Sequence, residues 1–225
     1  MSNKYYKQQR YHSDDSRQTW VADDVYQKGA LIEKDSILCS PFAYKWIAYY
    51  SSGSSRLGAY NGSMTIGAEE VPYNIGSEVV LSVIINNCVN AIGDRAFSEY
   101  RSLESVTIPD SVKRIEQLAF EGCYSLSSVD IPNGVARFGQ QAFYKCSGLT
   151  SIDIPSGVTS IGSQAFYQCE SLTSITVEAT TPPTLSSGVF NRTNDCPIYV
   201  PAASLSAYQS ANRWSDYASR IVAIP

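Results

Sequence analysis

The sequence predicts a β-rich (α+β) solenoid, in which short repeats stack as successive rungs. The first observation is an Ala-Phe pair that recurs every 23 residues, at Ala96-Phe97, Ala119-Phe120, Ala142-Phe143 and Ala165-Phe166. The second is a β-branched triplet about ten residues after each pair, with the apolar–polar alternation of a half-buried strand. These triplets are Val106-Thr107-Ile108, Val129-Asp130-Ile131, Ile152-Asp153-Ile154 and Ile175-Thr176-Val177.

The register continues in both directions along the chain. Val83-Ile84-Ile85 lies one period before the first triplet, and Ile198-Tyr199-Val200 lies one period after the last, which gives six rungs. One unit cannot bury its apolar inner face alone, so stacking buries these faces and pairs the strands into a parallel sheet. A fixed period in the twenties is typical of a right-handed leucine-rich-repeat solenoid.

The detailed pattern I-G-x-x-A-F-x-x-C-x-x-L-x-S-I-x-I-P-x-x-V covers residues 80–201. It resembles the BspA-like class of bacterial leucine-rich repeats. The closing segments TTPPTL, CPIYVP and RIVAIP also resemble the C-terminal ending of such proteins from gut Bacteroidetes. The resemblance implies a solenoid used for adhesion or recognition, usually at a cell surface, without catalysis.

Three domains are predicted: a small β-rich N-terminal module at 1–66, the solenoid at 67–201, and a C-terminal cap at 202–225. Lys45 to Tyr50 alternates, Ser51 to Ser55 is a turn and Arg56 to Tyr60 returns, which indicates a hairpin. Further strands are expected at 4–11 and 30–33. The aromatic residues of this module form either its core or an exposed glycan platform.

Ser13 to Trp20 resembles a degenerate Asp-box, with Arg17 in place of the usual glycine. The motif occurs in sialidases and in other β proteins, and a single copy indicates a hairpin turn rather than a sialidase.

Two further expectations concern the parts of the chain outside the main strands. Ile115 to Phe120 reads as a short helical or 3₁₀ turn on the convex side, where Tyr144 and Tyr167 form either an aromatic patch or partly buried packing. After Pro201, apolar residues at helical spacing predict a helix that seals the solenoid end, with Ala218 to Ile224 finishing the chain.

Composition restricts the partners. The net charge of −4 argues against nucleic acid, and no apolar stretch is long enough to insert into a membrane. The N-terminus is polar and has no signal-peptide core. We therefore expect a cell-surface or secreted location if a leader was removed, and otherwise a place in a virion or similar particle.

Catalytic and metal-binding chemistry has little support in the sequence. Cys123, Cys146 and Cys169 occupy one repeat position and are predicted to be buried thiols, while Cys39, Cys88 and Cys196 lie outside that column. With one histidine and no catalytic motif, we expect no enzyme, no metal and no cofactor. Asp130 and Asp153 form either a cation or acid–base site or a solvated pair.

The candidate ligand-binding residues are the outward-facing positions of the triplets and of the residue before each triplet. They form two columns, Ser105, Ser128, Ser151 and Ser174, and Thr107, Asp130, Asp153, Thr176 and Tyr199. Six rungs make a face roughly 24 Å long, with an area of about 300–400 Å², about half of what one partner buries in a standard interface.

The sequence thus predicts a non-enzymatic recognition or adhesion protein with a protein or glycan partner. The alternative is a structural or receptor-binding component of a phage or prophage particle, with residues 1–66 as the attachment module. Homo-oligomerisation or particle assembly would supply the avidity that a small face lacks.

Overall fold

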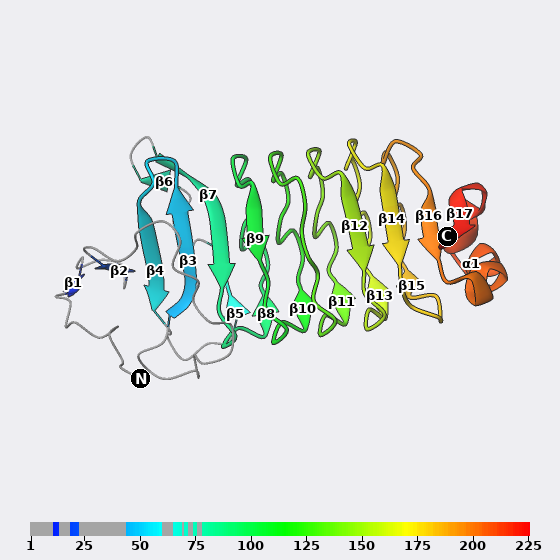
Figure 1. Ribbon diagram of the computed structural model, residues 1–225, viewed down its shortest axis with the longest axis horizontal. Coiled ribbons are helices and arrows are strands. Elements are labelled where there is room, and N and C mark those ends of the chain that lie inside the picture. The colour runs from blue at the N-terminus through cyan, green and yellow to red at the C-terminus, as the bar shows by residue number, and fades with distance from the viewer. Residues whose placement is uncertain are drawn as a thin grey trace.

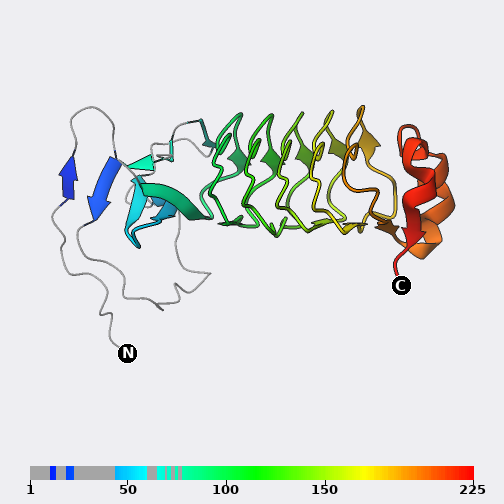
Figure 2. The same cartoon turned by 90° about the horizontal axis from the view of Figure 1, so that it is seen from above.

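The computed structural model describes residues 11–13, 19–22, 44–59, 65–68, 70–71, 74–75 and 78–225. The turn of the Asp-box, the strand expected at 30–33, most of the strand expected at 4–11, and Cys39 lie outside these residues. The strands and helices stack along one long axis from the N-terminal to the C-terminal end (Figures 1 and 2).

The main sheet begins with N-terminal strands and continues into the repeats. Its first part has seven strands in the order β1-β2-β4-β3-β7-β6, with β9 also paired to β7. These strands are β1 (Tyr11–Ser13), β2 (Thr19–Ala22), β3 (Tyr44–Tyr50), β4 (Ser55–Ala59), β6 (Asn74–Ile75), β7 (Glu78–Ile85) and β9 (Ser105–Thr107).

Strand β7 is the place where the two architectures meet. It pairs antiparallel with β3, through Ile84 and Ile47, and parallel with β9, through Val83 and Val106. The second pairing joins residues 23 apart, so the register predicted for the first rung is confirmed. The predicted hairpin is also present as β3 and β4, and it continues the sheet of the repeats.

The same side of the solenoid continues, after an interruption, as a second hydrogen-bonded segment of the main sheet. This segment is parallel, with the strand order β12-β14-β16-β17. Its strands are β12 (Ser151–Ile154), β14 (Ser174–Val177), β16 (Ile198–Val200) and β17 (Ile221–Ala223). Strand β17 is a rung that the sequence analysis missed, although Ile221 lies 23 residues after Ile198 and pairs with it.

The strand predicted at Val129 to Ile131 was wrong, because this segment is irregular and the sheet is interrupted between β9 and β12. Val129 is nevertheless buried and Asp130 exposed, so the inward–outward alternation survives. A regular ladder would place Asp130 beside Asp153, and like charges at neighbouring positions are destabilising. That repulsion is a physical reason for the break.

The opposite side carries a second parallel sheet instead of the predicted helical turn. Its six strands, in the order β15-β13-β11-β10-β8-β5, are two residues long. They are β5 (Thr65–Ile66), β8 (Ala91–Ile92), β10 (Arg114–Ile115), β11 (Arg137–Phe138), β13 (Ser160–Ile161) and β15 (Thr184–Leu185).

The turns after these strands explain why no helix forms. Leu118 has a φ of 58°, which lies in the left-handed region and breaks any right-handed helical run. The backbone N–H of Phe120 donates to the carbonyl of Ala142 in the next rung, at 2.7 Å, instead of to a carbonyl of its own turn. The turn is therefore stabilised by stacking between rungs.

The core is built from equivalent side chains of successive rungs. The rings of Phe97, Phe120, Phe143 and Phe166 stack with centroid separations of 5.1–5.3 Å. Beside them, the thiols of Cys123, Cys146 and Cys169 are buried and free, as predicted, and donate to the carbonyls of Phe97, Phe120 and Phe143. Burial raises the pKa of each of these thiols.

The N-terminal hairpin is fixed to the repeats by its buried face. Trp46 and Tyr50 are buried in the common core, whereas Tyr49 is half-buried. Of the two roles considered for the aromatic residues of this module, core packing therefore applies to Trp46 and Tyr50. Lys45 is buried and its ammonium group lies 2.7 Å from a carboxylate oxygen of Glu70 and 2.6 Å from the carbonyl of Thr65. This ion pair ties the hairpin to the start of the second sheet.

The C-terminal end is closed by short helices, as predicted. These are η1 (Ala202–Ser204), α1 (Leu205–Ser210) and η2 (Trp214–Arg220). Tyr208 and Trp214 are fully buried, while Leu205 and Ala211 pack half-buried against the core. The Trp214 ring lies 5.8 Å from that of Phe190, so the aromatic column ends on the cap.

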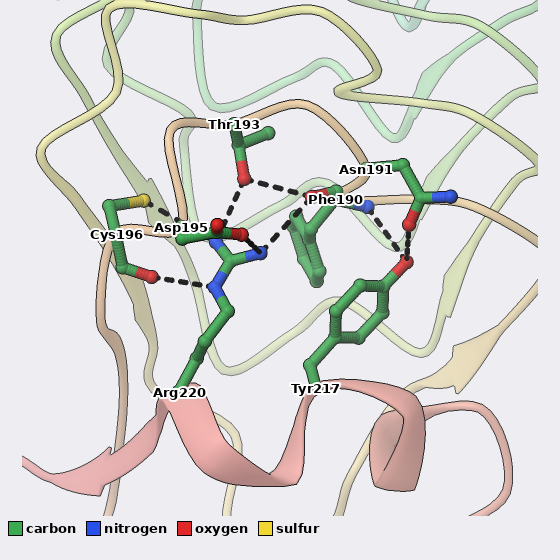
Figure 3. Close-up of polar contacts among 7 residues, drawn as sticks. All are labelled: Phe190, Asn191, Thr193, Asp195, Cys196, Tyr217 and Arg220. Atoms are coloured by element: carbon green, nitrogen blue, oxygen red, sulfur yellow. Dashed lines mark hydrogen bonds and ion pairs between the residues drawn. The ribbon is translucent and has the colours of Figure 1, made fainter.

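Arg220 joins the cap to the last rung (Figure 3). Its Nε donates to the carbonyl of Cys196 at 2.9 Å, its Nη1 to that of Phe190 at 3.2 Å, and its Nη2 to the hydroxyl of Thr193 at 2.8 Å. Tyr217 adds a bond from its hydroxyl to Asn191, at 2.9 Å. One side chain thus satisfies several backbone and side-chain acceptors that the end of the solenoid leaves open.

Candidate recognition surface

The predicted ladder residues lie on the outer face of the main sheet. Ser105, Thr107, Ser151 and Asp153 are exposed. Three others, Ser174, Thr176 and Tyr199, are half-buried. Ser128 and Asp130 are exposed too, but they lie in the irregular segment between β9 and β12.

The sheet brings together the C-terminal members of both columns. Ser151 is paired with Ser174, Asp153 with Thr176, and Thr176 with Tyr199. Asp130 has no strand partner, so it is not held opposite Asp153 in a ladder. Among the residues that the structure describes, no group of three or more His, Cys, Asp or Glu side chains could hold a metal ion.

Both columns are longer than the sequence analysis predicted. Ser82 pairs with Ser105 and Ile84 with Thr107, so each column gains a residue from β7. At the other end Val222 pairs with Tyr199. Subtracting or adding one period of 23 identifies all three positions, so the repeat itself carried the signal.

A third exposed column precedes the serines, formed by Glu104, Ser127, Thr150 and Thr173. The hydroxyl of Thr150 donates to the carbonyl of Ser127 at 3.1 Å, and that of Thr173 donates to the carbonyl of Thr150 at 3.0 Å. These bonds fix the two threonine side chains against the preceding rung. We call the three columns together the ladder face.

The C-terminal end of the ladder face is apolar. Val222 and Ile224 are the exposed large hydrophobic residues of the described chain, at 38% and 40% of their surface, and Val222 lies beside Tyr199. The face therefore has small hydroxyl and carboxylate groups in its middle and exposed apolar groups at its C-terminal end, whereas Ile84 at the other end is half-buried. The C-terminal end thus offers the larger apolar contact area.

The second sheet presents a different surface, with an open groove of about 350 Å³ that is lined from the residues after β10 through β11, β13 and β15. Glu116 lines this groove and is bonded by Arg114 Nε at 2.7 Å and by Arg137 Nη2 at 2.8 Å. Burial by itself would raise the pKa of Glu116, but the bonds and charges of the two arginines offset this and hold the pKa below its ordinary value.

Tyr144 and Tyr167 are half-buried, and their rings stack on each other at 5.5 Å. Lys145 lies 5.2 Å from the Tyr144 ring centre, and the guanidinium of Arg192 lies 5.8 Å from that of Tyr167. The pair thus combines flank packing with partial exposure, and its ring faces are occupied by each other and by the two cations.

The fold and the repeat define the class of protein, a leucine-rich-repeat solenoid. The family model described as "BspA type Leucine rich repeat region" matches residues 76–196 in six copies, which is more than half of the chain. The chain belongs to this family. None of the curated proteins matches it.

Several solved structures are similar. A Treponema pallidum leucine-rich repeat protein shares 22% identity over 53% of this chain and 68% of that one, with a TM-score of 0.45. A leucine-rich repeat protein from Bacteroides ovatus shares 20% identity over 88% of this chain and 55% of that one, with a TM-score of 0.44. The pneumococcal vaccine antigen PcpA shares 19% identity over 73% of this chain and 38% of that one, with a TM-score of 0.49. The chain thus spans about half of the Bacteroides ovatus protein and less of the pneumococcal one. No helix within the described residues is long and apolar enough to cross a membrane.

Proposed function

We propose that this chain is a non-enzymatic adhesion or recognition protein that binds a protein partner through the ladder face. The observation that carries the proposal is the ladder face itself, three columns of mostly small polar side chains, exposed or half-buried, that repeat along the main sheet. Family membership in the BspA-type repeats supports it.

The mechanism is presentation of a pre-ordered surface. The strands are paired, and the Thr150 and Thr173 hydroxyls are already bonded to the neighbouring rung. A partner that docks on such a face orders few protein side chains, and this reduces the entropic cost of association. The apolar end around Val222 supplies an area for hydrophobic contact, whereas the polar middle sets specificity.

The size of the ladder face shows what else is needed. The third column raises the area estimated for two columns to roughly 500 Å², still below the ~800 Å² that one partner contributes to a standard interface. We therefore propose that binding uses several copies of the face at once, through a homo-oligomer or an array at a cell surface or on a particle.

Surface plasmon resonance with a panel of purified cell-surface and extracellular-matrix proteins tests this proposal. Where a panel protein binds this chain, the Ser151→Lys variant of the chain, which places a long cation in the middle of the ladder face, should bind it at least tenfold more weakly. Asn133→Lys adds the same charge at an exposed turn away from the columns and should leave binding unchanged. Equal effects of the two substitutions, or no effect of either, would place the interface elsewhere.

Light scattering of the native protein at several concentrations separates the two settings of this function. A monomer at all concentrations is expected for a protein that gains avidity from an array on a surface. A closed oligomer that persists on dilution would mean that the chain supplies its own avidity, either in the recognition role or in the alternative role, a structural or receptor-binding component of a phage or prophage particle.

A further inference from the structure

The groove on the second sheet is separate from the ladder face and takes no part in the function proposed above. Its floor is formed by backbone at Gly139 and Gly162, which occupy the same repeat position in β11 and β13 units. A Cβ atom at Gly139 would lie 2.5 Å from the backbone nitrogen of Gln117, and one at Gly162 would lie 2.5 Å from that of Gln140. A side chain at either position would collide with the backbone of the preceding rung, so glycine allows these rungs to stack closely beneath the groove.

The same repeat position carries Glu116 one rung earlier, and this residue also lines the groove. The Glu116 carboxylate is held by Arg114 and Arg137, which lie at equivalent positions of β10 and β11. Only Arg137 lines the groove. Of its guanidinium, the described part of the chain engages Nη2 alone, so Nε and Nη1 are left for a ligand.

The groove lining carries one cation, Arg137, and two carboxylates, Glu116 and Asp94, and its remaining polar side chains are neutral. Arg114 lies outside the lining and pairs with Glu116. An anionic ligand therefore gains no net attraction here. An uncharged ligand keeps all of its hydrogen bonds without the cost of bringing in an unpaired charge.

The groups along the groove include both donors and acceptors. Arg137 donates, Glu116 accepts, the Gln117 and Gln140 amides do both, and hydroxyl groups follow at Thr184 and Ser186. A sugar hydroxyl also both donates and accepts. Adjacent hydroxyls of one sugar can therefore bond to an amide or a guanidinium through two parallel bonds, which a molecule with isolated polar groups cannot do.

The shape selects an extended ligand. A pocket for a compact small molecule encloses most of it and is largely apolar, whereas this groove is open and its lining is about half polar. It spans four rungs, from the residues after β10 to β15, and with a strand spacing of about 4.8 Å its length is roughly 14 Å. A linear polymer can lie along it and leave at the open end beside Ser186.

We propose that this groove binds a short stretch of a neutral, linear glycan, with Arg137, Gln117 and Gln140 bonding to its hydroxyl groups. Glu116 acts as a positioning residue, because its two bonds to Nη2 orient the Arg137 guanidinium. Binding is weak, with a Kd on the order of 1 mM, since no exposed aromatic ring in the groove adds a stacking surface. The repeated copies of an array raise the avidity.

The test is an NMR titration of the full chain with four neutral tetrasaccharides, namely maltotetraose, cellotetraose, xylotetraose and mannotetraose. At least one is expected to bind, with shifts of backbone amides at 137–140 and 160–162. Arg137→Ala should then weaken binding at least tenfold, as expected when a hydrogen bond from a charged donor is lost. Arg114→Ala is the matched control, because it also removes one arginine from Glu116 but lies outside the groove lining.

A second variant guards against indirect effects. Ser186→Tyr places a ring in the open end of the groove and should block binding, whereas Ser187→Tyr, one residue further along, should bind as the unchanged protein does. No binding of any of the four sugars at concentrations on the order of 10 mM would overturn the proposal. So would binding that Arg137→Ala and Ser186→Tyr leave intact, or preferential binding of an anionic glycan such as polygalacturonate.

Discussion

Each end of a solenoid exposes a strand edge and apolar core side chains, and the two ends of this chain cover them in different ways. At the N-terminal end the main sheet simply continues, because β3 pairs antiparallel with β7 and the hairpin adds further strands. At the C-terminal end the sheet stops at β17, and helices with three buried aromatic residues, Tyr208, Trp214 and Tyr217, cover the last rung (Figure 1). One end extends the hydrogen-bonded edge, and the other seals the core.

The comparison shows which groups of the terminal rungs must be covered at each end. The last rung carries Phe190, whose ring would face water without the cap, together with carbonyl groups that need donors. The first rung is covered instead by Trp46 and Tyr50, and its cross-connection is a buried ion pair. We therefore expect the C-terminal end to depend on packing and on Arg220, and the N-terminal end to depend on Lys45 and Glu70.

The largest expected effect is at the aromatic end of the cap. Trp214→Ala removes a fully buried ring that packs near Phe190 and Tyr208 and donates to the carbonyl of Pro183 at 2.7 Å. We expect the free energy of unfolding to fall by about 4 kcal/mol, from the cavity and the lost burial. Urea unfolding measures it, and a loss below about 1 kcal/mol would show that the cap adds little to the solenoid.

Arg220→Met should have the next largest effect, about 3 kcal/mol, because it leaves the carbonyl of Cys196 without its donor and removes one of two donors from the carbonyl of Phe190. Asp195→Asn is the control. Asp195 is 98% exposed and 4.0 Å from Arg220, so this substitution should change the unfolding free energy by less than about 0.5 kcal/mol. Equal effects of both would mean that the ion pair, rather than the bonds to the last rung, carries the stability.

At the N-terminal end, Glu70→Gln should cost about 2 kcal/mol. Lys45 is only 1% exposed and would lose the charge of Glu70 beside it, but Glu70 is 27% exposed, so solvent moderates the loss. Glu178→Gln, at an exposed position of a repeat, should have little effect. Hydrogen exchange adds the decisive comparison, since protection should fall in β3 and β7 and stay unchanged in β16 and β17.

How much of this could be read from the sequence depends on how regularly each feature repeats. The main-sheet rungs were predictable because an alternating triplet recurs at a fixed spacing, and the buried thiols because Cys123, Cys146 and Cys169 keep that spacing. The second sheet was not, because its strands are two residues long, too short to show alternation. Leu118 and Gln141 adopt positive φ without the glycine that usually marks it.

The candidate site could likewise be predicted only where its residues recur at the 23-residue period. The two columns named from the sequence lie on an exposed face, and their extension to Ser82, Ile84 and Val222 needed only one more period. Whether these residues bind a partner stays a prediction, as do the domain boundaries at 66 and 201. The groove was not predictable, because it depends on how closely Gly139 and Gly162 stack on the preceding rung, a distance that no sequence pattern states.

The smallest expected effect lies between the two ends, at Glu116 on the second sheet. Its pKa is lowered in the folded chain, so its bonds to Arg114 and Arg137 stabilise the fold above the ordinary value of 4.5, and this contribution is lost as the pH falls through the folded pKa. Glu116→Gln should therefore lower the unfolding free energy by less than about 1 kcal/mol at pH 7. Thermal unfolding at pH 7 and pH 3 should show the difference from the unchanged protein shrinking at the lower pH. A difference that is the same at both pH values would mean that Glu116 stabilises this sheet through packing, and that the middle of the solenoid, unlike its N-terminal end, uses no ion pair for its stability.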